Sequence, residues 1–276
     1  MYVSKEVPVG EGDFHGLNAE VCDIWDKNAD YWNDRMGEGN EFHRLLIAPA
    51  QERLLNLRPG DLVLDIGCGN GQFARRMAAL GAHVVALDGA PRMIENARAN
   101  ATARSESIEY RVVDATDSAA LISLGERRFD AAVCTMTMMD MASIGPMLAA
   151  LQRMLKPASR FVFSVCHPCF NSARVKLVAE EGTSDEGVMQ TRYSVNIAEY
   201  IRPRSAKGVA MKDQPVAQYY FDRPISVLFN ACFSSGFVLD GLEEPTFETG
   251  NDDGRPNWRN LIDIPPVLVA RMKLAS

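Results

Sequence analysis

The chain has 276 residues, of which 47% are hydrophobic and 24% are charged, as in a globular protein with one large domain or two small ones. Its formal net charge of -7 argues against a nucleic acid as the main partner, because phosphate binding needs clustered lysines and arginines. No segment has the length of a membrane-spanning helix, and the N-terminal stretch lacks a signal peptide's apolar core. We therefore expect a cytoplasmic protein with no membrane partner.

Residues 17–166 alternate between helical and strand patterns. A helical region is predicted at 17–57, with a break at 37–40 and an end at the Arg-Pro-Gly of 58–60. Five apolar strands, each separated from the next by a helix, indicate a parallel sheet that is covered on both faces. The strands are predicted at 62–67, 83–88, 108–114, 129–136 and 160–166, and the helices at 70–81, 90–103, 118–125 and 144–157.

Residues 171–222 interrupt this alternation. The segment is polar and irregular, although 191–201 alternates like a strand. After it we expect a helix at 224–236 and two strands at 237–245 and 265–273. Because no helix connects these two strands, one of them should be antiparallel to the sheet.

The stretch "VLDIGCGNG" (63–71) predicts a ligand site at the first strand-to-helix turn. Its glycines permit a tight turn and a close approach of backbone to ligand, and Asp88 at the end of the next strand can hold ribose hydroxyls. A nicotinamide or flavin site would favour G-x-G-x-x-G, whereas the spacing here is G-x-G-x-G. Asp65 within the strand would repel a pyrophosphate but suit a positively charged ligand. A glycine-rich turn without a ligand is the remaining interpretation.

Five motifs in this order resemble those of class I S-adenosylmethionine-dependent methyltransferases. They are "VLDIGCGNG", "VVALDGAPRMIENAR", "YRVVDATD", "FDAAVCTMTMMDM" and "LKPASRFVFSV", which together cover roughly residues 60–170. The resemblance implies an α/β, Rossmann-like, doubly wound sheet of seven strands, mostly parallel with one antiparallel strand. It also implies S-adenosylmethionine as cofactor, S-adenosylhomocysteine as product, and a methyltransferase domain at 60–276.

The resemblance assigns cofactor contacts position by position. Backbone at the glycine turn would lie under the methionine part, near an acid that faces its ammonium, and the second strand would supply the ribose and adenine contacts. The third strand would supply a contact to the adenine edge, and the fourth a rim beside the sulfonium. The predicted cofactor residues are Asp65, Gly67, Cys68, Gly69, Asp88, Gly89, Met93, Asp114, Ala115, Cys134 and Thr135.

Substrate contacts are expected from three segments outside the cofactor core. Residues 1–59 would form a helical lid, with Tyr31 as the best candidate to touch the substrate, and the apolar stretch after the fourth strand would form a rim. Residues 171–222 would form a cap that ends in "QYYFDRP", similar to the Y-x-H-R-P of many small-molecule members, with Asp222 in place of the histidine. The predicted substrate-binding residues are Trp32, Phe42, His43, Met136, Met139, Phe170 and Tyr219.

The stretch "SVCHPCF" (164–170) places His167 after the fifth strand, where it is a candidate base beside an acceptor. Tyr31 and Tyr220 are the other predicted catalytic residues. The two cysteines are predicted to be incidental, because a redox dithiol would start a helix after an early strand and a zinc site would need two further ligands. We expect no catalytic metal.

The sequence thus predicts methyl transfer from S-adenosylmethionine to a small acceptor. The many Met, Phe and Tyr candidates at the mouth favour an aromatic metabolite, such as an indole or phenol of secondary metabolism, methylated at oxygen, nitrogen or carbon. A non-catalytic cofactor-binding regulator and an NAD-dependent oxidoreductase remain alternatives. The protein is expected to act as a monomer or a homodimer.

Overall fold

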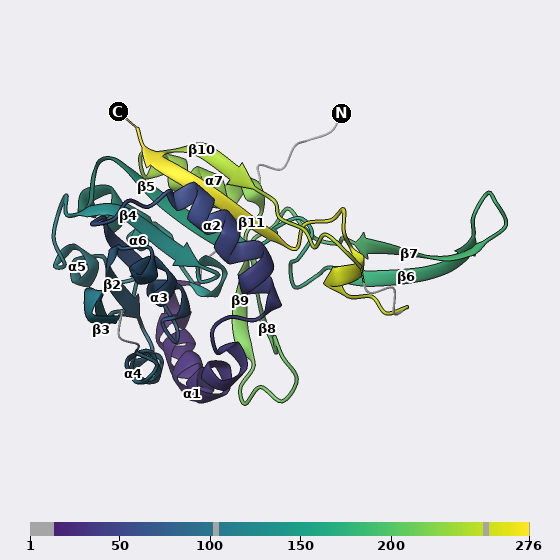
Figure 1. Cartoon of the computed structure of the whole chain (residues 1–276), viewed down its shortest axis with the longest axis horizontal. Coiled ribbons are helices and arrows are strands. Elements are labelled where there is room, and N and C mark those ends of the chain that lie inside the picture. Colours follow the sequence, from purple (N-terminus) through teal and green to yellow (C-terminus); the bar gives the residue numbers. More distant parts are fainter. Residues whose placement is uncertain (1–13, 102–104, 251–253, 276) are drawn as a thin grey trace.

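A seven-stranded sheet forms the centre of the molecule (Figure 1). The structure is a computed structural model, and it describes residues 14–101, 105–250 and 254–275. The sheet order is β10-β11-β5-β4-β1-β2-β3, and β11 runs antiparallel to both of its neighbours. The prediction of a mostly parallel sheet with one antiparallel strand is therefore confirmed. The strands are β1 (Leu62–Ile66), β2 (His83–Asp88), β3 (Ile108–Val112), β4 (Phe129–Thr135), β5 (Leu155–Cys166), β10 (Phe237–Glu243) and β11 (Val267–Leu274).

Helices cover both faces of this sheet, which makes it doubly wound. Along β1 the buried side chains alternate, so that Val63 belongs to one apolar core and Leu64 to the other. The first core is completed by α2 (Ala48–Leu55), α3 (Gln72–Ala79) and α4 (Pro91–Ala99). The second is completed by α5 (Ser118–Ile122), α6 (Gly145–Met154) and α7 (Ile225–Ser234).

The predicted helix at 144–157 ends earlier than its pattern indicates. Helix α6 stops at Met154, and β5 begins at Leu155. Pro157 explains the difference, since proline lacks the N–H that a continuing helix needs and disfavours helical backbone in the residue before it. The last two residues of the helix predicted at 90–103, residues 102 and 103, lie outside the described residues.

The N-terminal region is helical and interrupted where the glycines predict. Helix α1 (Asn18–Met36) ends at Gly37, and a π-helical segment (Phe42–Ile47) leads directly into α2. Helix α1 packs beside α4 and β9 (Gln218–Asp222), so it lies across the end of the sheet where β2 finishes (Figure 1). The first 13 residues of the predicted lid are outside the described residues.

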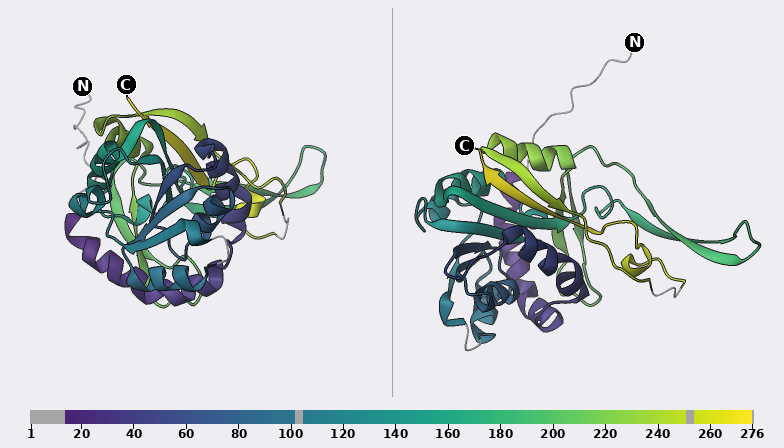
Figure 2. Two further views of the ribbon diagram at one scale, coloured as in Figure 1. Left: turned by 60° about the vertical axis from the view of Figure 1, so that its left-hand side comes forward. Right: turned by 45° about the horizontal axis from the view of Figure 1, so that its top comes forward.

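The segment 171–222 is more regular than its composition indicates. It forms two antiparallel hairpins, one of β6 (Lys176–Thr183) with β7 (Met189–Asn196) and one of β8 (Arg204–Gly208) with β9. The β6–β7 hairpin projects away from the sheet in every view, whereas β8 and β9 lie along α1 (Figures 1 and 2). Only the second hairpin is therefore placed to cover a site near the sheet.

Candidate active site

A cavity of about 920 Å³ opens at the carboxyl ends of the parallel strands. Its walls come from the turns after β1, β2, β3, β4 and β5, from α1 and from the β8–β9 hairpin. Ligand sites of α/β sheets lie at this edge, and small-molecule pockets span roughly 300–1,000 Å³. The volume is near the upper end of that range, so the cavity has room for a cofactor and a second small molecule.

The glycine turn after β1 forms the floor of one half of the cavity. Gly67 has a φ of 68°, and a Cβ added there would lie 2.3 Å from the Thr137 side chain. The Cys68 N–H donates to the carbonyl oxygen of Leu87 at 2.8 Å, which fixes the turn against β2. Only glycine fits at position 67, because the backbone needs a positive φ and the rim segment after β4 touches it.

Asp65 is the most unusual group in this half. Its side chain is 1% exposed and neither carboxylate oxygen has a hydrogen-bond partner among the described residues. Burial, with a smaller contribution from the charge of Asp88, raises the pKa of Asp65 to about 7. A buried acid without a partner is costly, so its place in the cavity wall is suited to a cationic group of a ligand.

Asp88 ends β2 and is held in place by two backbone donors. Its oxygens accept hydrogen bonds from the N–H groups of Gly69 and Ala90, each at 2.9 Å. Burial raises the pKa of Asp88 to about 6, and these two hydrogen bonds oppose the shift. Each carboxylate oxygen can accept more than one hydrogen bond, so Asp88 retains capacity for a pair of ligand hydroxyls.

The turn after β3 and helix α1 close the far end of this half. Asp114 accepts hydrogen bonds from the backbone N–H and the hydroxyl of Thr116, both at 2.8 Å, and the Asn18 amide donates to that hydroxyl at 3.0 Å. Met93 is 4% exposed and packs with Trp32, whose buried indole N–H has no partner among the described residues. The predicted cofactor residues Gly89 and Ala115 also line the cavity.

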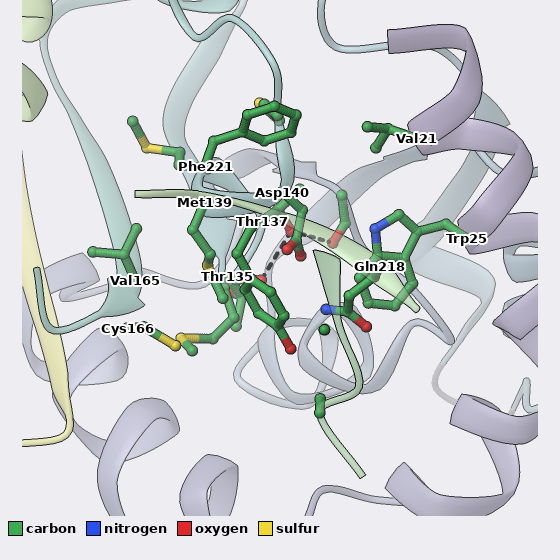
Figure 3. Close-up of a pocket in the computed structure, with 18 of the residues that line it drawn as sticks. Val21, Trp25, Thr135, Thr137, Met139, Asp140, Val165, Cys166, Gln218 and Phe221 are labelled. Atoms are coloured by element: carbon green, nitrogen blue, oxygen red, sulfur yellow. Dashed lines mark hydrogen bonds between the residues drawn. The ribbon is translucent and has the colours of Figure 1, made fainter. Parts of the chain in front are cut away.

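The other half of the cavity is more apolar (Figure 3). Met139, Val165 and Cys166 lie on one side of the view, and Trp25 and Val21 of α1 lie on the other. Thr135, Met136, Tyr220 and Phe221 add to these walls. This half combines sulfur, aromatic and aliphatic surfaces with the polar groups of Thr135, Thr137, Asp140 and Gln218, which suits a largely apolar molecule that carries a polar group.

His43 lies in the cavity wall as predicted, together with Phe42. Burial lowers the pKa of His43 to about 4, so its imidazole is neutral at pH 7. The side-chain oxygen of Asn40 lies 3.0 Å from both the backbone nitrogen and Nδ1 of His43. With Nδ1 as the donor, Nε2 carries the lone pair of this imidazole.

The geometry contradicts the role predicted for His167. Its ring is 1% exposed and lies outside the cavity lining, with Nε2 at 2.7 Å from a Glu244 carboxylate oxygen. Nδ1 accepts a hydrogen bond from the Cys169 N–H at 3.2 Å. Both ring nitrogens are thus engaged, so no lone pair remains to take a proton from an acceptor. Phe170, which was predicted to bind the substrate, instead packs on the His167 ring, with 4.5 Å between the ring centroids.

Three further predicted residues lie outside the lining. The Tyr31 hydroxyl donates to the carbonyl oxygen of Lys212, and the Tyr219 hydroxyl lies 2.9 Å from a Glu20 carboxylate oxygen. Both therefore join α1 to the β8–β9 hairpin region instead of facing a ligand. Cys134 is fully buried within β4, one residue before the cavity edge. Its neighbour Thr135 does reach the cavity and bonds to Gln51 at 3.1 Å.

Several lining residues were not predicted from the sequence. Asp140 and Gln218 place polar groups in the apolar half, and Cys166 and Trp25 add to its walls (Figure 3). Asp140 could have been predicted from the sequence, because a carboxylate within the largely apolar stretch 136–141 is costly to bury unless it has a functional role. Gln218 begins the stretch "QYYFDRP", which the sequence does place at the site, but the prediction there fell on Tyr219 and Tyr220.

Comparisons with known proteins identify the family. A family profile described as a methyltransferase domain matches residues 63–158. A ubiquinone biosynthesis O-methyltransferase from Thiobacillus denitrificans is 30% identical over 70% of this chain and 82% of its own length. The chain belongs to the class I S-adenosylmethionine-dependent methyltransferases. The expectation from the five ordered motifs is thereby confirmed, and the match disfavours the nicotinamide oxidoreductase that the glycine turn had left open.

Other proteins that this methyltransferase resembles match different shares of the chain. A ubiquinone biosynthesis O-methyltransferase from Xanthomonas oryzae pv. oryzae is 32% identical over 55% of this chain, which spans only 62% of that relative's length. A solved S-adenosylmethionine dependent methyltransferase from Mesorhizobium loti has a TM-score of 0.62 at 24% identity, covering 81% of this chain and 95% of its own. A methyltransferase from Streptomyces caelestis has a TM-score of 0.58 at 14% identity, over 93% and 99%. These two structures support the fold alone.

The cofactor of this family is S-adenosylmethionine, and the residues present fit it. The unpartnered carboxylate of Asp65 matches a ligand ammonium, Asp88 matches ribose hydroxyls, and the glycine turn leaves room for close backbone contact. Among the described residues no cluster of three or more His, Cys, Asp or Glu could hold a metal ion. Within the same residues, no helix combines the length and apolarity that crossing a membrane requires.

Proposed function

We propose that this methyltransferase transfers the methyl group of S-adenosylmethionine to a small aromatic metabolite, at a hydroxyl of phenol type. One observation carries the proposal: the cavity continues past Asp65 and Asp88 into an apolar half bounded by Met139, Val165 and Phe221. Burial of an aromatic ring against such walls stabilises the bound molecule, by roughly 25 cal/mol for each Å² of apolar surface removed from water. The names of the relatives, which specify O-methylation in ubiquinone biosynthesis, support oxygen as the acceptor atom.

The residues of the chain would act by holding the two molecules and excluding water. The bound cofactor supplies a methyl group on a positively charged sulfur, which is ready for displacement. The glycine turn and Asp65 would fix the methionine end, and Thr137 joins that turn to the acceptor half through its hydrogen bond to the Gly67 carbonyl at 3.1 Å. Since orientation and dehydration lower the barrier of a displacement, the apolar walls contribute to rate as well as to affinity.

Calorimetry and a turnover screen test this proposal. We expect S-adenosylhomocysteine to bind the protein and NAD not to bind. Phenols, indoles and aromatic amines would then be incubated with S-adenosylmethionine, and methylated products would be measured by mass spectrometry. A non-catalytic regulator would bind S-adenosylhomocysteine and methylate none of these acceptors. NAD binding without S-adenosylhomocysteine binding would contradict the assignment of the cofactor.

A further inference from the structure

Asp140 is a buried carboxylate in the more apolar half of the cavity, which we call the acceptor half. None of the predicted cofactor contacts involves it. It ends the short 3-10 helix Met138–Asp140 after β4 and is 6% exposed. One carboxylate oxygen, Oδ1, has no hydrogen-bond partner among the described residues, although Asp140 lines the cavity. Figure 3 shows it between the Thr135–Met139 rim and Gln218.

A chain of amides orients this carboxylate. The Gln214 amide donates to the Val216 carbonyl at 2.7 Å and to the Gln218 side-chain oxygen at 3.1 Å. Because the Gln218 oxygen accepts that bond, its NH₂ group is the part available to hydrogen bond to the Asp140 carboxyl. One oxygen of Asp140 is thus occupied, whereas Oδ1 is buried and has no hydrogen-bond partner among the described residues.

The turn that carries Asp140 is itself held rigidly. The buried Arg223 guanidinium donates to the carbonyl oxygens of Met138, Met141 and Ala142 at 3.0, 2.7 and 3.1 Å. The Asp140 N–H donates to the Thr137 carbonyl at 2.8 Å, and the Thr137 hydroxyl reaches Gly67. Asp140 therefore sits at a fixed position relative to the methionine end of the cofactor site.

The groups around Asp140 make it a strong base for a carboxylate. Burial is the main cause that raises its pKa well above the ordinary value, and the charge of Asp88 adds to this while the bond from Gln218 opposes it. The other titratable groups that feel its charge are Tyr220, Cys166 and Cys134. Burial raises the pKa of all three, so they are neutral at pH 7 and do not compensate the carboxylate.

We propose that Asp140 is the general base of the reaction and that the acceptor group it recognises is a hydroxyl that donates a hydrogen bond to Oδ1. This inference rests on the proposed function. As the hydroxyl oxygen bonds to the methyl carbon, the carbon–sulfur bond breaks with its electron pair on sulfur. The hydroxyl proton passes to Oδ1 of Asp140. The products are a methyl ether, S-adenosylhomocysteine and a protonated Asp140 that releases its proton to water.

The test compares wild type with Asp140→Asn, which keeps the shape but removes the base. S-adenosylhomocysteine calorimetry confirms that the variant is folded, and Glu126→Gln serves as a matched control at an exposed ion pair with Arg153. With a weakly acidic phenol, turnover of Asp140→Asn should fall at least about 100-fold, the lower end of general-base contributions. The loss should shrink with 4-nitrophenol, which is far more acidic than an ordinary phenol and is partly ionised at neutral pH, so it needs less help from a base. Equal turnover of the two proteins overturns the inference.

A spectroscopic titration gives a readout that does not depend on turnover. When 4-nitrophenol binds the complex with S-adenosylhomocysteine, a facing carboxylate should raise the pKa of the bound phenol relative to that in Asp140→Asn. Equal values, or no binding of 4-nitrophenol to that complex, overturn the inference. Failure of wild type to bind S-adenosylhomocysteine instead overturns the proposed function, so the two failures are distinguishable. Turnover of indole carbon alone, with phenols untouched, also counts against Asp140 as the base.

Discussion

At the scale of single residues, the candidate site is built from acids that the fold alone does not need. Asp65 occupies a strand position where its neighbours Leu64 and Ile66 are core side chains, and neither of its oxygens has a hydrogen-bond partner in the described part of the chain. A carboxylate in that setting lowers the stability of the free protein, because burial removes its hydration without replacement. A cationic ligand group that pairs with Asp65 would offset this loss of stability.

Replacing Asp65 by asparagine should therefore stabilise the free protein. The folded-state pKa of about 7 lies above the ordinary value of 3.8, so the folded state binds the proton more tightly than the unfolded state. The penalty of Asp65 grows as the pH rises from about 4 to about 7 and is complete above that. Asp65→Asn should gain on the order of a few kcal/mol at about pH 8 and little at about pH 4. Urea unfolding of both proteins across this range measures the difference.

Affinity for S-adenosylhomocysteine should change in the opposite direction. Loss of the ionised partner of an ammonium is expected to weaken binding by about 1.5–3 kcal/mol, measured by calorimetry. In wild type the affinity should also decline as the pH falls below about 7, because Asp65 must give up its proton before it can pair. A pH-independent affinity in wild type would remove Asp65 from the ammonium site.

At the scale of elements, the site depends on contacts between segments that are distant in sequence. The turn after β1 and the rim after β4 touch at Gly67 and Thr137, whose hydroxyl donates to the Gly67 carbonyl. Helix α1 is joined to the segment before β9 by Asn28, which is fully buried. Its amide donates to the Val216 carbonyl at 2.8 Å and its oxygen accepts from the Val216 N–H at 2.9 Å, as a neighbouring strand would.

Gly67→Ala should reduce stability through contact with the rim. The added Cβ would lie within 2.8 Å of three Thr137 atoms, and overpacking of this kind costs about 1–3 kcal/mol. Gly69→Ala is the matched control, since its φ of 53° imposes a similar backbone strain but no atom lies within 4 Å of the new Cβ. Thermal unfolding should show a larger loss for Gly67→Ala, and Thr137→Ala should restore part of it. Identical losses at the two glycines would exclude the contact with Thr137 as the cause.

Asn28→Ala should loosen α1 from the second hairpin. The change leaves the Val216 N–H without its partner, at a cost of roughly 1–3 kcal/mol, whereas the Val216 carbonyl still accepts from the Gln214 amide. Because α1 and this hairpin both line the cavity, S-adenosylhomocysteine affinity should fall together with stability. Asn28→Asp keeps the acceptor for the Val216 N–H but sets a buried carboxylate against the Val216 carbonyl, so chemical denaturation should show a loss of stability for this variant as well. An unchanged affinity in Asn28→Ala would show that α1 does not help to hold the ligand.

At the scale of the whole molecule, local pattern predicted the sheet, and most of the residues predicted to hold the cofactor line one cavity at its edge. The alternation of apolar strands and helices, and the missing helix before β11, are properties of neighbouring residues and can be read along the chain. The glycine turn, Asp65 within β1 and Asp88 at the end of β2 are likewise local. Met93, Asp114 and Thr135 follow from the motifs and reach the same cavity.

The acceptor half was harder to predict because it is assembled from long-range contacts. Sequence places His167 at a strand end but cannot show that Glu244, 77 positions later, takes its Nε2. In the same way Tyr31 and Tyr219 look like ligand contacts until Lys212 and Glu20 are found opposite their hydroxyls. Asp140 is the opposite case. The sequence did not single it out, and a role for it can be proposed only from the structure, where β9 brings Gln218 beside it.

The projecting β6–β7 hairpin makes one part of the chain exchangeable. Lys176 and Asn196 are register partners at its base, so their Cα atoms are about 5 Å apart and a two-residue turn such as Asn-Gly can connect the strands there. Replacing residues 177–195 by such a turn should leave the melting temperature and S-adenosylhomocysteine affinity near those of the full chain. A large loss of either would reveal that the hairpin supports the core. If both persist, the hairpin is a graft point, where a tag, a label or another protein's ribbon can be inserted while the catalytic cavity keeps its walls.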